Sequence, residues 1–194
     1  MRAPMHDLHV SNLVTYTALA AAVSAVTLAL DAGRVHLAAA AIGIAAIADT
    51  FDGRFARLFH RTERQAQCGR EIDSLVDAVA FGAAPIVVVV ATVGPSPPLA
   101  AAAVFYVVAV VTRLASYNVE GDGAGFVGVP TPAAALLCAT ALLLPREAWV
   151  GGWPLAIAGA AMIAPLGIPR PRALGLAVFA CWAVAVVGLH VMQQ

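Results

Sequence analysis

The sequence predicts an all-α, polytopic integral membrane protein, and three observations lead to this fold class. Of the 194 residues, 61% are hydrophobic and only 11% are charged, whereas a soluble domain carries about 25% charged residues. The mean hydropathy is +0.87. Most of the apolar runs are close to the roughly 20 residues that a helix needs to cross a bilayer, and two are shorter. The formal net charge is zero, so the composition gives no reason to expect nucleic acid or another polyanion as a partner.

Seven apolar runs carry the predicted helices. In chain order they are 13–30, 37–59, about 70–93, 99–116, 133–144, 154–164 and 173–192. Ser11 and Asn12 precede the first run as a helix-capping signal. The first run is expected to be a retained helix, because no small-residue cleavage site follows it.

The basic residues predict the orientation. All eleven are arginines. The predicted inner loops hold Arg54, Arg57, Arg61, Arg64, Arg70, Arg113, Arg170 and Arg172, and the outer turns hold Arg34 and Arg146. Because cytoplasmic loops carry the excess of positive charge, the polar segment 61–70 is expected in the cytoplasm and the protein in the plasma membrane.

Several other polar residues receive structural interpretations. Arg61, Glu63, Arg64 and Glu71 are expected to be solvated loop charges. His60, His190 and the tryptophans are expected at the membrane boundary.

Four aspartates lie at the ends of two apolar runs. Asp49 and Asp52 fall in the second run, and Asp73 and Asp77 in the first two turns of the third. A carboxylate costs about 2.5–3.5 kcal/mol at the centre of a membrane helix, so such residues indicate a functional site. Spacings of three and four place each pair on one helix face. A short connection lets the two helices run antiparallel, so the four carboxylates are expected to converge at the cytoplasmic end.

Four neighbouring acids need cations to remain ionised together. Ligands that are all oxygen favour hard ions, so we expect two divalent cations, Mg²⁺ or Mn²⁺, that could clamp the phosphates of a substrate. Gly53 and Ala56 expose the helix backbone to a bulky ligand, and Arg57 offers bidentate contacts to phosphate. Two alternatives stay open: the acids could pair with loop arginines, or they could mark the ion or proton pathway of a transporter.

The pattern Asp-x2-Asp-Gly-x2-Ala-Arg, then Gly-x3-Asp-x3-Asp after eleven residues, resembles the signature of the CDP-alcohol phosphotransferase family. All eight fixed positions are present: Asp49, Asp52, Gly53, Ala56, Arg57, Gly69, Asp73 and Asp77. The resemblance implies a six-helix core with a seventh, C-terminal helix, and a homodimer. It also implies one transmembrane domain over residues 1–194, of which 165–194 match only loosely.

The resemblance further implies roles for individual residues. Asp49, Asp52, Asp73 and Asp77 would bind the two cations, and Asp77 would also be the general base that takes the proton of the acceptor hydroxyl. The site for the CDP-lipid would be lined by Asn12, Thr15, Gly53, Ala56, Arg57 and Gly69. A helix cap is an equal alternative for Asn12.

Three segments resemble the phosphatidylserine synthases within this family, namely 73–85, 113–118 and 126–134. Members that use phosphorylated acceptors carry lysines where this chain has Gly128-Val-Pro130, and this chain has no lysine. The resemblance therefore implies CDP-diacylglycerol as donor and serine as acceptor. Glycerol 3-phosphate or inositol phosphate stays open as the acceptor. Arg113 could bind the serine carboxylate or be an ordinary positive-inside anchor, and Asn118 could contact the acceptor or be a turn residue.

Overall fold

A computed structural model describes residues 9–31, 34–120, 126–168 and 173–193. Its elements are the 3₁₀-helix η2 (Val10–Asn12), α1 (Leu13–Ala29), α2 (Val35–Ala56), α3 (Glu63–Asp77), the π-helix η3 (Ala78–Ala83), α4 (Ala84–Val93), α5 (Pro97–Glu120), β1 (Phe126–Val127), α6 (Thr131–Ala141), the 3₁₀-helix η4 (Arg146–Gly152), α7 (Trp153–Ile163), β2 (Gly167–Ile168) and α8 (Ala173–Val191). The predicted arginines Arg170 and Arg172 lie outside the described residues.

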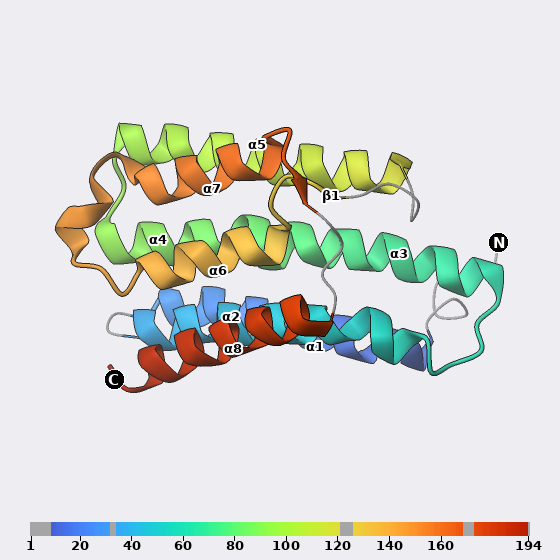
Figure 1. The fold of residues 1–194 in the computed structure, drawn as a ribbon. Coiled ribbons are helices and arrows are strands. Elements are labelled where there is room, and N and C mark those ends of the chain that lie inside the picture. The colour runs from blue at the N-terminus through green and yellow to red at the C-terminus, as the bar shows by residue number, and fades with distance from the viewer. Residues whose placement is uncertain (1–8, 32–33, 121–125, 169–172, 194) are drawn as a thin grey trace.

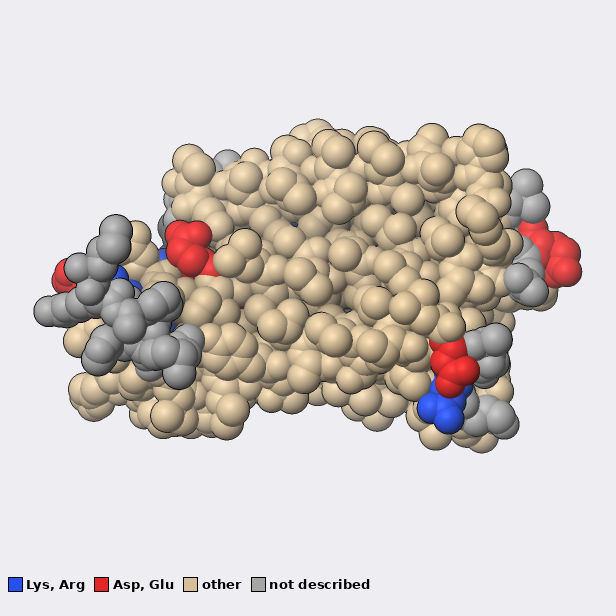
Figure 2. Space-filling model, turned by 180° about the vertical axis from the view of Figure 1, so that it is seen from behind, with Lys and Arg blue, Asp and Glu red and all other residues tan. Residues whose placement is uncertain are grey.

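The helices run side by side along one long axis (Figure 1). Within the described part of the chain, five helical segments are long and apolar enough to cross a membrane: Val10–Ala29, Val35–Ala56, Glu63–Val93, Pro97–Val119 and Leu174–Val191. The face in Figure 2 carries its charged side chains towards the two ends and is uncharged along its middle. The protein is therefore a multi-pass, all-α membrane protein, which confirms the predicted fold class.

All seven predicted runs become helical, but the third begins at Glu63 and not near Arg70. Thr62 and Gln65 form a capping box in which the Thr62 hydroxyl accepts the Gln65 amide at 3.2 Å. The Gln65 side chain accepts the Thr62 amide at 3.0 Å in return. This cap satisfies the first amides of α3. The polar start of α3 thereby extends the transmembrane helix at its N-terminal end. Asp73 and Asp77 consequently lie in the second half of α3, so their expected place in its first two turns is wrong.

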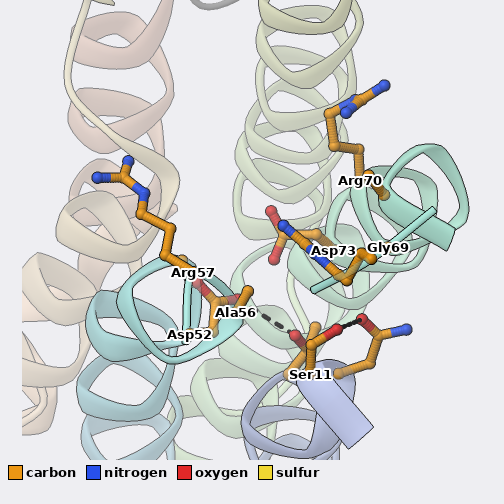
Figure 3. A pocket seen from close by; sticks show the side chains of 12 residues that line it. Ser11, Asp52, Ala56, Arg57, Gly69, Arg70 and Asp73 are labelled. Carbon is orange, nitrogen blue, oxygen red and sulfur yellow. Dashed lines mark hydrogen bonds between the residues drawn. The ribbon is translucent and has the colours of Figure 1, made fainter. Parts of the chain in front are cut away.

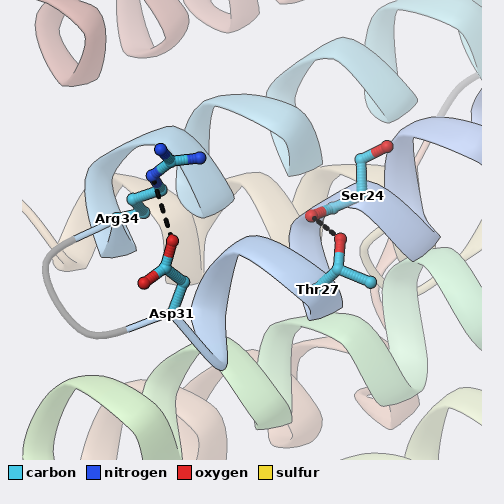
Figure 4. Close-up of polar contacts among 4 residues, drawn as sticks. All are labelled: Ser24, Thr27, Asp31 and Arg34. Carbon is cyan, nitrogen blue, oxygen red and sulfur yellow. Dashed lines mark hydrogen bonds and ion pairs between the residues drawn. The ribbon is translucent and has the colours of Figure 1, made fainter.

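The fourth predicted helix is also longer than its apolar run. α5 extends from Pro97 to Glu120, so Asn118 is helical and its interpretation as a turn residue is wrong. At the opposite end of the bundle, Gly94 has φ +84° and separates α4 from α5. The turn between α1 and α2 carries an ion pair at 3.1 Å between Arg34 and Asp31 (Figure 4).

The helix interfaces are built from small residues. The buried face of α1 consists of Thr15, Ala18, Ala22, Ala25 and Ala29, and α2 buries the residues from Ala38 to Gly43 together with Ala45 and Ala46. Small side chains let membrane helices approach closely, since lipid supplies no hydrophobic driving force between them. A Cβ at Gly43 would lie 2.6 Å from a methyl group of Val187, so α2 and α8 are in close contact there.

Two residues expected at the membrane boundary are instead buried. His190 is fully buried, with its Nδ1 2.9 Å from Nδ1 of His36 and its Nε2 2.9 Å from the carbonyl oxygen of Ala139. Trp149 is also buried, and its indole donates to the carbonyl oxygen of Ala141 at 3.1 Å. Both side chains are retained inside because their polar atoms find partners there.

A short antiparallel ladder ties the two halves of the C-terminal region together. Val127 pairs with Gly167, and the amide of Gly128 donates to the carbonyl oxygen of Leu166 at 2.9 Å. Gly128 has φ +75°, and a Cβ there would overlap the carbonyl group of Met162. The ladder and this close approach fix the place where α6 begins at Thr131.

Candidate active site

The structure brings the four predicted aspartates together. Carboxylate oxygens of Asp49, Asp52 and Asp73 all lie within 4.8 Å of one another. Asp77 is not part of this group of three, but it lies close to Asp49. The residues come from the last turns of α2 and the second half of α3, so the convergence of the two pairs agrees with the prediction from their spacing.

Two of the aspartates accept hydrogen bonds from threonine hydroxyls, and two carboxylate oxygens of the cluster have no donor within the part of the chain that the structure describes. Thr15 donates to Oδ2 of Asp52 at 3.3 Å, and Thr131 donates to Oδ2 of Asp77 at 3.3 Å. Oδ1 of Asp73 and Oδ1 of Asp77 are buried and find no hydrogen-bond partner among the described residues. Buried acceptors without a donor are costly, and converging carboxylate oxygens are the ligands that hard divalent cations prefer. The residues present therefore fit a divalent cation.

A polar pocket of about 210 Å³ opens beside the acids. It is bounded by the start of α1, the end of α2 and one face of α3 (Figure 3). Its lining consists of Ser11, Asn12, Thr15, Asp52, Gly53, Ala56, Arg57, Arg61, Ala66, Gly69, Arg70 and Asp73. All six residues predicted for the CDP-lipid line this one pocket, together with two of the four aspartates. Asp49 and Asp77 are not part of the lining.

Two glycines shape the pocket in different ways. A Cβ at Gly53 would meet nothing within 4 Å, so its place is open space. A Cβ at Gly69 would lie 3.1 Å from Oδ1 of Asn12 and 3.4 Å from the guanidinium of Arg61. Gly69 therefore lets α3 approach the start of α1, whereas Gly53 leaves room for a ligand against the backbone of α2.

The side chain of Asn12 lines the pocket and does not cap α1. It occupies the N-cap position of α1, but its side chain makes no capping hydrogen bond. The residue is 3% exposed. Its Oδ1 accepts from the hydroxyl of Ser11 at 3.3 Å, and its Nδ2 has no partner among the described residues. A buried amide donor at a pocket wall offers a hydrogen bond to a ligand oxygen.

Sequence reasoning missed four lining residues: Ser11, Arg61, Ala66 and Arg70. Arg61, which is expected to be a solvated loop charge, does lie in the loop before α3, but it is half-buried and its guanidinium lies close to Gly69. The Thr62–Gln65 capping box was the available signal, since it places Arg61 directly before the helix that carries Gly69. Figure 3 shows Arg57 and Arg70 on opposite sides of Asp73.

The two predicted acceptor residues lie outside the lining of this pocket. Arg113 is 9% exposed. Its Nε donates to the carbonyl oxygen of Val129 at 2.7 Å, and its guanidinium also reaches the carbonyl oxygen of Gly128 at 3.4 Å. A buried side chain bound to backbone carbonyls does not fit an anchor at the lipid headgroups. Asn118 exchanges two hydrogen bonds with Ser74, at 2.9 and 3.1 Å, next to Asp73.

A π-helical turn, which the sequence pattern did not reveal, follows the last acid directly. η3 begins at Ala78, one residue after Asp77. The hydroxyl of Tyr106 donates to the carbonyl oxygen of Phe81 within this turn at 2.7 Å. π-turns interrupt α-helices mostly at functional sites. Here the turn lies between the acid-bearing helix α3 and the apolar helix α4.

The fold and this site define a multi-pass membrane protein with an acid cluster suited to cations beside a polar pocket. Residues 8–169 match the family model described as CDP-alcohol phosphatidyltransferase. The chain therefore belongs to the CDP-alcohol phosphatidyltransferase family, as the signature resemblance implied.

Similar curated proteins carry one name, CDP-diacylglycerol–serine O-phosphatidyltransferase. The protein from Mycobacterium tuberculosis is 34% identical over 92% of this chain and 66% of its own length. The Mycobacterium leprae protein is 39% identical over 72% of this chain and 48% of its own length. The Methanocaldococcus jannaschii protein is 29% identical over 76% of this chain and 72% of its own length. The chain thus spans less than two thirds of the length of the mycobacterial relatives.

Proposed function

We propose that this protein transfers a phosphatidyl group from CDP-diacylglycerol to the hydroxyl of serine, which forms phosphatidylserine and releases CMP. One observation carries the proposal: the six residues predicted for the donor line a single pocket together with Asp52 and Asp73. The names of the relatives support the donor and the acceptor. This function belongs to phospholipid biosynthesis.

The donor would bind with its diphosphate beside the aspartates. Arg57 and Arg61 would bind phosphate oxygens, because a guanidinium offers paired donors that match them. The open space at Gly53 would let the nucleotide lie against α2. The buried amide of Asn12 would donate to an acceptor atom of the ligand, which would satisfy an otherwise unpaired donor.

Two divalent cations, Mg²⁺ or Mn²⁺, would be held by Asp49, Asp52, Asp73 and Asp77. When bound, they would neutralise the acids and stabilise the charge that develops on the diphosphate. Asp77 would accept the proton of the acceptor hydroxyl as it attacks the lipid-side phosphorus. The position of Asp77 beyond the pocket lining, with one buried oxygen lacking a partner, supports this role.

The acceptor would approach from the side of α5 and α6. Arg113 holds the carbonyls of Gly128 and Val129, and Thr131 of the same segment contacts Asp77. Asn118 is bonded to Ser74 between the two acids of α3. These contacts support Arg113 and Asn118 as residues that bind or border serine. The lack of lysine favours an acceptor without phosphate.

The setting of the enzyme is also a proposal. The arginines near the site favour a plasma membrane location with the active site at the cytoplasmic face. By family resemblance the protein would act as a homodimer, with one transmembrane domain over residues 1–194 and a loosely matched extension over 165–194. The acid cluster at one end of the helices supports an enzyme over a transporter, whose acids would be spread across the membrane.

The test is an acceptor panel with the purified protein in lipid–detergent micelles. CDP-diacylglycerol and Mn²⁺ are supplied with labelled serine, glycerol 3-phosphate or inositol phosphate. Serine should give labelled phosphatidylserine, and the Asp77→Asn variant should lose turnover. Product from another alcohol but none from serine would overturn the acceptor assignment, and full activity of Asp77→Asn would remove this residue from its role.

A further inference from the structure

Most helix hydroxyls of this protein bond to their own helix. The hydroxyls of Thr17, Ser24, Thr50, Thr92 and Thr140 each donate to the carbonyl four residues earlier, at 2.7–2.9 Å. Thr27 donates to the carbonyl oxygen of Ser24 at 3.0 Å (Figure 4). Such bonds satisfy a hydroxyl in an apolar environment without any partner from another helix. A helix hydroxyl that donates to a different helix therefore departs from the common arrangement in this protein.

Thr15 and Thr131 depart from this pattern, because both donate to an aspartate on a different helix. Thr15 lies within α1 and is 6% exposed, and its hydroxyl reaches Asp52 of α2 at 3.3 Å. Thr131 is the first residue of α6 and is 2% exposed, and its hydroxyl reaches Asp77 of α3 at 3.3 Å. Two helices that carry none of the four acids thus each contribute one donor to the cluster.

The atoms involved show what these donors do. Oδ2 of Asp77 is held by Thr131, whereas Oδ1 of the same carboxylate is buried and has no partner among the described residues. A carboxylate held through one oxygen keeps the other in a fixed direction, and residues that orient metal ligands in this way raise metal affinity. The threonine bond therefore leaves Oδ1 as the Asp77 oxygen that is available to a cation.

The backbone around Thr131 is itself fixed. The amide of Gly128 donates to Leu166, and the amide of Val129 donates to the carbonyl oxygen of Ala161 at 2.9 Å. The guanidinium of Arg113 binds the carbonyl oxygen of Val129. The hydroxyl of Thr131 is thereby carried on a segment tied to α5 and α7, so Asp77 is oriented by three helices besides its own.

We propose that Thr15 and Thr131 are positioning residues that orient Asp52 and Asp77 towards divalent cations, one threonine for each acid-bearing helix. This inference rests on the proposed function, which places cations at the aspartates. Removal of a partner of this kind costs roughly 10–100-fold in metal affinity. Because both bonds measure 3.3 Å, we expect the lower end, about tenfold.

The experiment measures Mn²⁺ binding to the purified protein in detergent, without any substrate, by electron paramagnetic resonance of the free ion. Thr131→Val removes the hydroxyl with little change of shape, and Thr131→Ser keeps it. The pair Thr15→Val and Thr15→Ser repeats the comparison on α1. Thr92→Val is the matched control, since its hydroxyl bonds only to the carbonyl oxygen of Val88 in its own helix.

The valine variants should bind Mn²⁺ about tenfold more weakly, and the serine variants and Thr92→Val should bind like the parent. With saturating Mn²⁺, Thr131→Val should keep the KM for CDP-diacylglycerol, because Thr131 does not line the donor pocket. Parent affinity in Thr131→Val, while Asp77→Asn loses binding, would overturn this inference and leave the proposed function standing. Failure of the parent protein to bind Mn²⁺ would overturn both.

Discussion

Gly53 offers a test in which stability and ligand binding should change in opposite directions. A Cβ at this position meets no protein atom within 4 Å, and Gly53 lies within α2 and lines the donor pocket. Replacing a helix glycine by alanine stabilises the helix by up to about 1 kcal/mol. For a chain of this size that corresponds to a rise in Tm of roughly 2–4 °C.

The same methyl group should weaken the binding of the nucleotide. If the nucleotide lies against the backbone of α2, the added carbon occupies its place, and we expect at least about tenfold weaker CMP binding, or about 1.4 kcal/mol. Tm from a thermal unfolding assay and the Kd of CMP from calorimetry measure the two effects on one preparation. A destabilised protein cannot imitate this result, because the expected Tm is higher.

Gly188→Ala is the matched control. Gly188 is exposed, a Cβ there also meets nothing within 4 Å, and it stands three residues before the end of α8 as Gly53 does in α2. It should raise Tm similarly and leave the Kd of CMP unchanged. Unchanged CMP affinity in Gly53→Ala would refute the idea that the ligand lies against this stretch of α2.

Three further predictions concern the supports of the site. Gly128→Ala should unfold at a clearly lower temperature and lose activity, because φ is +75° and the new Cβ would overlap the carbonyl of Met162; a Tm within 1 °C of the parent's, about the uncertainty of the assay, would contradict this. Tyr106→Phe leaves the buried carbonyl oxygen of Phe81 without its 2.7 Å donor, which should cost about 1–3 kcal/mol in the free energy of unfolding. Unfolding in denaturant at unchanged midpoint would show that the π-turn does not need this bond. Chelation with EDTA should abolish turnover and Mn²⁺ should restore it, if the four aspartates hold the cations as proposed; turnover that persists in EDTA would exclude the proposed role of the ions.

Local spacing was enough to predict the arrangement of the acids. Asp49 and Asp52 are three apart and Asp73 and Asp77 four apart, so helix geometry alone fixes each pair on one face. The apolar runs then restrict how the two helices can be connected. The same reasoning placed Gly53 and Ala56 beside the acids, where the pocket lies.

The prediction from composition is wrong for the polar start of α3, which is helical and not a loop. The charges of the segment after Thr62 predict a loop, although Thr62 and Gln65 carry a capping signature and the segment is helical. A long run of apolar residues indicates a helix in lipid, whereas a helix exposed to water is indicated by its caps and by the period of its apolar residues.

Contacts between distant segments could not be predicted from one sequence. Thr131 and Asp77 are 54 residues apart and His36 and His190 are 154 apart, and no periodicity relates them. The π-turn at Ala78–Ala83 likewise depends on a distant segment. The carbonyl oxygen of Phe81 in this turn accepts a hydrogen bond from the hydroxyl of Tyr106, which belongs to α5. These features depend on which helices become neighbours, which only the folded chain determines.

The most direct test of the central claim is an experimental structure of the protein with Mn²⁺ and CDP-diacylglycerol. Anomalous scattering would locate the manganese, and density would locate the nucleotide. The account predicts manganese among Asp49, Asp52, Asp73 and Asp77, with the diphosphate beside Arg57 and the nucleotide over Gly53 and Gly69. Manganese bound away from these four aspartates, or nucleotide bound away from the pocket between α1, α2 and α3, would contradict it.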